Sequence, residues 1–179
     1  MQAFVNTRWD LERSLTEQLA SPAELARWLS DHGLLEPGSR LTRRDLGRVL
    51  QVREGLRALL FANNGAAPDG EAIKRLNDAL DGTGLDLRFD RTGAPALEPS
   101  GGGIDGALAS IAGLVAASQI AGSWSRLKAC PGRHCGWAFY DHSRNRSGSW
   151  CSMSTCGQRT KAREYRRRKK QSGIRSSAP

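Results

Sequence analysis

Apolar positions in the first half of the chain recur at helical spacing. Residues 21–32 open with Ser21 and, three positions later, Glu24, a capping box that predicts the start of a helix. Residues 42–65 form a longer amphipathic segment that ends at Asn-Asn-Gly, and residues 69–82 form a shorter one. The apolar positions of the longer segment are Leu46, Val49, Leu50, Leu56, Leu59 and Leu60. We therefore expect three consecutive helices.

The period changes to two in residues 84–99. Leu85, Leu87 and Phe89 alternate with polar residues, and the Asp-Arg-Thr-Gly that follows is typical of a hairpin turn, so two short strands are expected. After a glycine-rich break, residues 104–124 are largely apolar and rich in small side chains. This composition predicts a helix that is buried on most sides. Because Gly and Ser interrupt it and it is short, we do not expect it to span a membrane.

The elements divide the chain into two parts and a tail. Residues 1–123 are expected to form a mostly helical domain with a small β-hairpin, residues 124–170 a small module, and residues 171–179 a disordered tail. The fold class expected is α+β, mainly α, because 39% apolar residues suffice for one modest core. The N-terminus has no basic stretch followed by an apolar one, so we expect no signal peptide and a cytoplasmic protein without a membrane partner.

Positive charge is concentrated at one end of the chain. The net charge is +9, and residues 124–179 hold 14 of the 27 Lys and Arg side chains but only two of the 18 acidic ones. Such asymmetry is typical of a neutral or acidic domain joined to a module that binds a polyanion. A solvated basic tail is the alternative interpretation of the charge run taken alone.

All four cysteines lie in this basic part. Cys130, Cys135, Cys151 and Cys156 follow the spacing C-x4-C-x15-C-x4-C, which fits a structural zinc ion held by two pairs of thiolates. An iron–sulfur cluster and two disulfides are the alternatives, although the first has tighter, asymmetric spacing and the second is typical of secreted proteins. His134 and His142 are alternative ligands, but four thiols already complete the shell.

The residues around the cysteines support a small metal-stabilised module. Thr155 and Gln158 stand in capping-box relation, which predicts Thr155 as the N-cap of a helix whose first residue is Cys156. A thiol at the positive end of a helix ionises more easily and so binds metal better. The aromatic residues between the cysteine pairs are expected to pack around the ion, because so short a module cannot bury enough surface without it.

A basic helix is predicted after the last cysteine. Its cations recur along one stripe, as in an element that contacts phosphates or enters a groove of DNA. The predicted nucleic-acid-binding residues are Arg159, Lys161, Arg163, Arg166, Arg167 and Lys170 in the helix, with Arg144 and Arg146 in the preceding loop.

The sequence from residue 126 to residue 168 resembles the CGNR zinc finger of bacterial regulators. The resemblance covers both cysteine pairs, the stretch "WAFYDHSRN", the tetrapeptide "WCSM" and the basic helix. The Cys-Gly-Asn-Arg that names the family is Cys156-Gly157-Gln158-Arg159 in this chain. The basic residues that the family has before Trp-Cys are reduced here to Ser-Gly-Ser. The resemblance implies a treble-clef-like or ribbon-like finger with one structural zinc ion.

The upstream part resembles the ABATE domain that usually precedes this finger. The segments "FVNTRW", "SPAELARWLSDHGLL" and "VREGLRALLFA" carry this similarity. Together the two resemblances cover nearly the whole chain, and they imply a stress-related transcription regulator.

We therefore expect a zinc-dependent DNA-binding transcription regulator associated with the nucleoid. Its N-terminal domain is expected to sense a small-molecule effector or to form a homodimer. An RNA-binding or ribosome-associated zinc protein is the alternative, because zinc modules with basic tails also serve RNA. An enzyme is not expected, since residues 1–123 contain no cysteine, one histidine and no phosphate-binding loop. A polar trio, Asn6, Thr7 and Arg8, is the candidate ligand pocket, with helix capping as the competing role.

Overall fold

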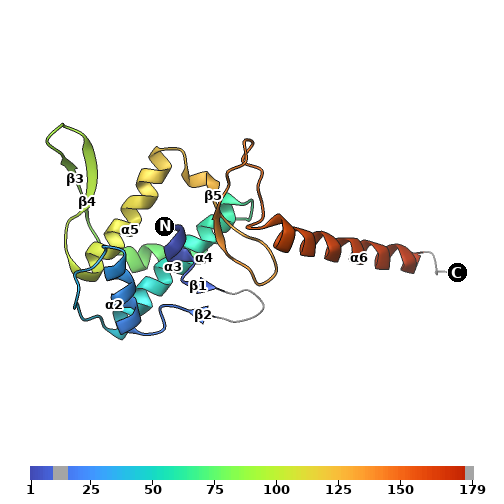
Figure 1. Cartoon of the computed structure of the whole chain (residues 1–179), viewed down its shortest axis with the longest axis horizontal. Helices are drawn as coiled ribbons and strands as arrows, with labels where there is room; N and C mark the ends of the chain where they lie inside the picture. Colours follow the sequence, from blue (N-terminus) through green and yellow to red (C-terminus); the bar gives the residue numbers. More distant parts are fainter. Residues whose placement is uncertain (10–15, 176–179) are drawn as a thin grey trace.

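The structure is a computed structural model that describes residues 1–9 and 16–175. Its helical body lies between two projections, a β-hairpin at one end and a long helix at the other (Figure 1). The helices of the body are α1 (Gln2–Val5), α2 (Pro22–Asp31), α3 (Arg43–Asn63), α4 (Gly70–Leu80) and α5 (Gly103–Ile120). The projecting helix is α6 (Gln158–Arg175).

The helices predicted from periodicity are confirmed, and their caps explain where they start. The Ser21 hydroxyl accepts a hydrogen bond from the backbone N–H of Glu24 at the start of α2, and Asp69 caps α4 in the same way. Thr42 and Asp45 form a reciprocal capping box at the start of α3. Each such cap stabilises its helix by about 1 kcal/mol.

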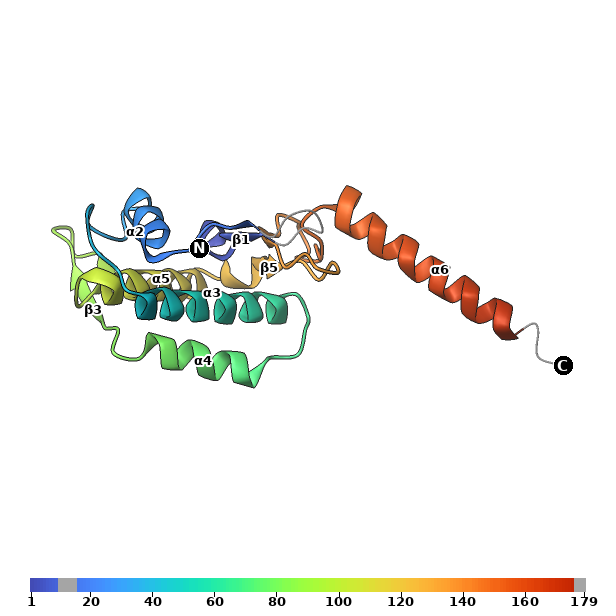
Figure 2. The same cartoon turned by 90° about the horizontal axis from the view of Figure 1, so that it is seen from below.

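Helix α3 is the centre of the core. Its buried side chains include Val49, Val52, Leu56 and Leu60, each contributing roughly 1.5–3 kcal/mol through burial. Helix α4 packs along α3, and the two lie one below the other in Figure 2. A Cβ atom on Gly55 would lie 2.6 Å from Cβ of Leu76, so a side chain there would separate the helices.

The predicted hairpin is confirmed as β3 (Leu85–Phe89) paired with β4 (Pro95–Pro99). Its neighbour α5 differs from the prediction, because it is not buried on most sides. The face that contains Leu108 and Ile111 is buried in the core, whereas Leu114 and Ile120 are exposed. By length and composition α5 also meets the minimum for a membrane crossing, with a mean hydropathy of 1.4 over 18 residues. Core helices of soluble proteins meet the same criterion, so this is weak evidence for a membrane segment.

Two further strand pairs are present, and of their four strands the sequence indicated β6 (Ala138–Tyr140) alone, since Trp137 to Tyr140 fit the two faces of a strand. Strand β1 (Arg8–Trp9) pairs with β2 (Thr16–Glu17), and β5 (Leu127–Ala129), which follows the turn η1 (Trp124–Arg126), pairs with β6. Strand β5 packs against α3. Leu127, Ala129 and Ala138 therefore belong to the same apolar core as the helices. The C-terminal module is joined to the body by a shared core and is not separated from it by a linker.

Helix α6 is longer than expected and includes part of the segment predicted to be a disordered tail. Helix α6 continues to Arg175, so residues 171–175 are helical and not a disordered tail. Residues 176–179 of the predicted tail lie outside the described residues. Beyond its first turn α6 extends away from the body in both views (Figures 1 and 2).

Candidate metal centre and nucleic-acid interface

Four thiols meet where the body joins α6. Cys130 directly follows β5, Cys135 closes the turn after it, and Cys151 and Cys156 come from the segment around η2 (Met153–Gly157). Their Sγ atoms all lie within 4.8 Å of one another, and Cys135–Cys151 and Cys151–Cys156 are each 3.7 Å apart. Sulfurs bound tetrahedrally to one zinc ion at about 2.3 Å lie roughly 3.8 Å from each other. The four thiols therefore fit one zinc ion.

The same distances exclude the other arrangements considered for these cysteines. A disulfide joins its sulfurs at about 2.05 Å, whereas all four cysteines are free and the pairs Cys135–Cys151 and Cys151–Cys156 are each 3.7 Å apart. In an iron–sulfur cluster the four thiolates are divided among two or four irons, which spreads the set of sulfurs further apart than around a single ion. Neither histidine joins the group: His134 and His142 are exposed, and the His142 ring packs against Tyr140. One structural zinc ion with four cysteine ligands is the cofactor of this site.

Crowding of the thiols moves their pKa values apart. A hydrogen bond from Cys135 lowers the pKa of Cys130 to about 5, and the same bond, together with burial, raises the pKa of Cys135. Burial and the neighbouring Cys130 raise the pKa of Cys151 to about 12. Thiolates packed so closely repel one another, so all four ionise together only when a cation balances them. This electrostatic requirement matches a divalent, thiolate-binding metal.

The local backbone explains how the thiols converge. Gly132 passes so close to Cys156 that a Cβ atom on it would lie 3.2 Å from the Cys156 sulfur. The prediction that Thr155 caps the helix is wrong, because the Ser152 hydroxyl accepts the hydrogen bond from the Thr155 N–H and the helical turn starts at Met153. Cys156 thus lies within the helical turn and not at its first position. The predicted aromatic packing is confirmed for Phe139, Trp137 and Trp150.

A buried ion pair between Lys128 and Asp141 holds the loop that connects the two cysteine pairs. The Lys128 ammonium donates hydrogen bonds to the Asp141 carboxylate (2.8 Å) and to the carbonyl oxygens of Arg146 (2.6 Å) and Gly148 (2.9 Å). Burial opposes ionisation of Asp141, but hydrogen bonds from Lys128 and Ser143 hold its pKa well below the usual range. The exposed side chains of Arg144 and Arg146 are therefore carried on an ordered loop.

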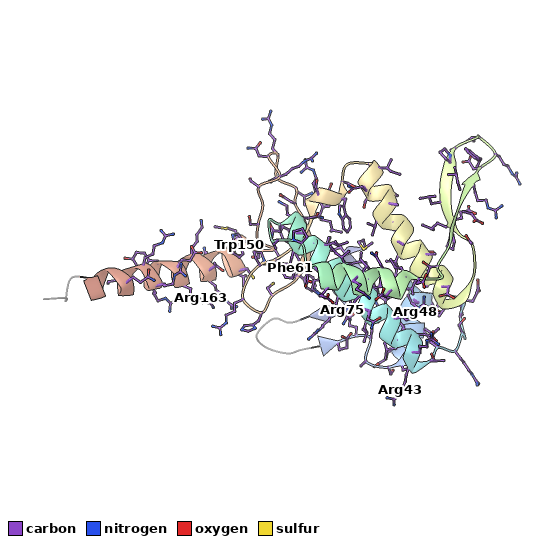
Figure 3. All side chains as sticks on the ribbon, turned by 180° about the vertical axis from the view of Figure 1, so that it is seen from behind. Arg43, Arg48, Phe61, Arg75, Trp150 and Arg163 are labelled. Atoms are coloured by element: carbon purple, nitrogen blue, oxygen red, sulfur yellow. The ribbon has the colours of Figure 1, made fainter. Side chains whose placement is uncertain are left out.

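The predicted cationic side chains of α6 are exposed to solvent. They are Arg159, Lys161, Arg163, Arg166 and Arg167, and the side chain of Lys170 lies outside the described residues. Tyr165 is also exposed. Figure 3 shows side chains on all sides of α6, with Arg163 near the end that joins the body.

Comparison with protein families agrees with both parts of this architecture. Residues 1–126 match the ABATE family, described as "Putative stress-induced transcription regulator". The chain belongs to the ABATE family. Residues 126–169 match the CGNR zinc finger. No curated protein matches the sequence.

The ABATE domain holds the CGNR finger through side-chain amides that sequence reasoning missed. Asn6 forms two hydrogen bonds with the backbone of Ala138, Asn63 donates to the carbonyl oxygen of Leu127, and Asn64 donates to that of Ala129. The Asn63-Asn64-Gly sequence predicts only the end of α3. The side-chain amides of Asn63 and Asn64 also bind the backbone of β5, because the edge of this strand lies directly beside the end of α3.

Arg57 forms a further link between the ABATE domain and the metal site. Its guanidinium group donates to the carbonyl oxygen of Gly136, which directly follows Cys135, at 2.6 Å, and to the carbonyl oxygen of Val5. Glu54 accepts a third hydrogen bond and keeps the guanidinium oriented. Sequence periodicity places Arg57 on α3 but gives no sign of this contact, since the partner lies 79 residues away.

Further cations lie beside the metal site. A small hollow between the first cysteine turn and the start of α6 is lined by Arg133, His134, Arg159, Thr160 and Arg163. Arg133 and Thr160 are absent from the predicted interface, although a cation adjacent to a predicted zinc turn is a usable signal. The first cysteine turn and the start of α6 thus both contribute positive charge to this hollow.

The predicted pocket residues do not act together. The Asn6 amide is hydrogen-bonded to the backbone of Ala138. Thr7 is buried, and its hydroxyl donates a hydrogen bond to the carbonyl oxygen of Phe4 and accepts one from Arg53. Arg8 alone of the three lines a hollow, of about 410 Å³, between the ABATE domain and the first cysteine turn. An effector site at this position stays a prediction.

Proposed function

We propose that this ABATE protein is a zinc-dependent, DNA-binding transcription regulator. In this proposal the CGNR finger and helix α6 contact DNA, and the ABATE domain senses an effector or forms a dimer. The protein acts as a regulator and not as an enzyme, and it associates with the nucleoid in the cytoplasm.

The observation that carries the proposal is the position of α6 relative to the metal site. The thiol cluster lies at the N-terminal end of α6, because Cys156 precedes Gln158, the first residue of the helix, by only two positions. The remainder of the 18-residue helix extends into solvent with its described cations exposed (Figure 1). A bound zinc ion would therefore set the direction in which the charged helix points. A basic tail that served only for solubility would need no such anchor.

The shape of α6 favours duplex DNA over duplex RNA. An 18-residue helix is roughly 27 Å long and about 10–12 Å wide with its side chains. The major groove of B-DNA, about 12 Å wide, admits such a helix, whereas the major groove of A-form RNA is deep and narrow. In this proposal Arg144 and Arg146, whose side chains are exposed on the ordered loop, contact phosphates beside the groove.

The proposal is tested by fluorescence anisotropy of the zinc-loaded protein with a DNA duplex and an RNA hairpin of equal length. We expect DNA binding whose logarithmic affinity falls steeply with the logarithm of salt concentration, since cations that meet phosphates release counterions. Tighter binding to RNA than to DNA at equal salt, or no binding to either, would overturn the proposal. Genome-wide mapping of binding sites would then identify the operator and the regulated genes.

A further inference from the structure

An apolar wedge opens at the end of the ABATE domain opposite the finger. One wall is the β3–β4 hairpin and the other is the exposed face of α5. The two walls touch at their base, where the Leu85 side chain lies 3.5 Å from the position that a Cβ on Gly113 would take. The hairpin and the C-terminal end of α5 diverge from this base (Figure 1). The space between them is about 800 Å³.

The walls of this wedge carry no charge. The pairing of Leu87 with Leu97 and of Phe89 with Pro95 places the apolar residues of both strands on one face of the hairpin. Asp86 and Arg88 lie on the opposite face, where they form an ion pair. Within the described residues, the lining of the wedge consists of apolar side chains, a glycine and Ser110. Such a surface offers nothing that would attract nucleic acid or an acidic headgroup.

The exposed apolar area approaches the area that a specific interface buries on each partner. Five large apolar residues are exposed at the wedge or on the hairpin face that forms its wall: Leu87 (58%), Phe89 (65%), Leu97 (41%), Leu114 (50%) and Ile120 (83%). A free side chain of this size exposes roughly 200 Å², so together these residues expose on the order of 600 Å². A specific interface buries about 800 Å² per partner, and the alanines and prolines that also line the wedge extend the area toward that value. An apolar patch of this size on a monomer usually marks a contact surface.

We infer that the wedge is the dimer interface of this protein, and that the occupant is a second copy of the chain related by a two-fold axis. The wedge combines a protruding apolar helix face with an apolar groove, which is the self-complementary combination that a two-fold interface requires. In this arrangement α5 of each copy lies in the wedge of the other copy. Ala117 on α5 and Ala121 at its C-cap are small enough to allow a close helix–helix approach.

The position of the wedge is compatible with the proposed function. The hairpin and α6 lie at opposite ends of the molecule in both Figure 1 and Figure 2, so pairing through the wedge leaves both basic helices free. The inference specifies the dimerisation role proposed above for the ABATE domain, but it does not depend on DNA binding. Its test uses no DNA, so its failure is distinguishable from failure of the proposed function.

The test is the mass of the zinc-loaded full chain, measured by light scattering and sedimentation over a wide range of protein concentration. We expect twice the chain mass of 19.5 kDa for the wild type. Leu114→Asp places a carboxylate in the centre of the wedge and should weaken self-association about thirtyfold or more, as expected for a central interface residue. Ile120→Lys should act in the same direction, and its side chain is so exposed that the fold does not depend on it.

The matched control is Arg88→Gln, on the outer face of the same hairpin, which should leave the dimer intact. Circular dichroism and zinc content establish that each variant is folded. A monomeric wild type at all concentrations would overturn the inference, as would a dimer that both wedge variants leave unchanged. Binding of the wild type to neutral phosphatidylcholine vesicles that is lost in Leu114→Asp would also overturn it, because the occupant would then be a membrane.

Discussion

The side-chain amide of Asn6 pairs with the backbone of Ala138 through two hydrogen bonds, one donated to the carbonyl oxygen at 2.9 Å and one accepted from the N–H at 2.8 Å. The two residues are 132 positions apart, and both are buried. Asn6 thus takes the place that another strand would have at the edge of β6. The zinc-binding half of the chain is thereby held in a fixed position on the ABATE domain.

Replacement of Asn6 by alanine should destabilise the protein markedly. Asn6→Ala leaves the N–H and carbonyl groups of Ala138 buried without partners, which costs about 3 kcal/mol. Urea denaturation of the zinc-loaded protein measures this loss. Gln2→Ala, at an exposed position of α1, is the control and should change the unfolding free energy by less than about 0.5 kcal/mol. Equal stability of the two variants would show that Asn6 does not hold the finger.

Glu17 should make the stability of the ABATE domain depend on pH. Its carboxylate accepts two hydrogen bonds of 2.7 Å from the fully buried guanidinium of Arg53. Partial burial raises the pKa of Glu17, but the hydrogen bonds from Arg53 outweigh that effect, so its net pKa lies below the ordinary value of 4.5. A depressed carboxyl pKa contributes stability that is present above the unfolded pKa and is lost as the pH falls through the folded pKa.

The corresponding variant is Glu17→Gln, which should be about 2 kcal/mol less stable than the wild type near neutral pH. It removes the charge that accepts two hydrogen bonds from the buried guanidinium of Arg53, and Glu54, 2.9 Å from the Arg53 Nε, is the counter-charge that remains. The difference between the two proteins should shrink as the pH falls from 4.5 through the lower folded pKa, because the carboxylate is protonated in the unfolded chain before it is protonated in the folded protein. Urea denaturation at a series of pH values measures it. Acid release of zinc affects both proteins equally, so a difference that stays constant with pH would contradict the role given to Glu17.

The sequence predicted the elements whose signals are local. Ser21 and Asp69 specify helix starts from neighbouring residues, and the alternation of Leu85, Leu87 and Phe89 specifies a strand without reference to the remainder of the fold. The cysteine spacing likewise predicted the metal site, because only thiols brought together can bind one ion. These signals need no knowledge of distant contacts.

The features that the sequence did not predict depend on long-range contacts. Asn64 ends a helix in the local pattern, but its amide also binds backbone carbonyls of Ala129 and Ser149. Helix α5 has the composition of a fully buried helix, yet one of its faces is exposed because the hairpin diverges from it. The helix cap is Ser152 and not the predicted Thr155. Either hydroxyl could cap a helix, but the turn that brings Cys156 to the other thiols starts at Met153, one residue after Ser152.

Individual cations of α6 should contribute measurably to DNA affinity. Each phosphate contact adds about 0.9 to the slope of logarithmic affinity against logarithmic salt concentration. The double variant Arg163→Gln with Arg167→Gln should therefore lower the slope by about 1.8 and weaken binding to all DNA sequences similarly. Anisotropy titrations at four salt concentrations measure the slope.

The control for this pair is Arg75→Gln on α4. Figure 3 shows Arg75 on the body of the protein, away from Arg163 on the projecting helix. Arg75 is exposed and faces Glu71 at 4.0 Å, a surface pair that contributes little to stability. We expect it to leave the slope unchanged. A decrease of the slope in Arg75→Gln that is half as large as in the double variant, which removes twice the charge, would indicate a response to net charge alone and would contradict a specific role for α6.

Loss of one zinc ligand should release the metal and destabilise both halves of the protein. Cys130→Ser removes a thiolate from the cluster, and the three remaining thiols cannot complete a tetrahedral structural site. Zinc content should fall from one ion per chain to well below that value. The melting temperature should fall as well, because Ala129, next to Cys130, and Ala138 belong to the core that α3 anchors.

His142→Ala is the matched control: this histidine is exposed and lies outside the thiol cluster, so zinc content should stay at one ion per chain. Full zinc content in Cys130→Ser, or loss of zinc in His142→Ala, would show that the ligand set is not the four thiols.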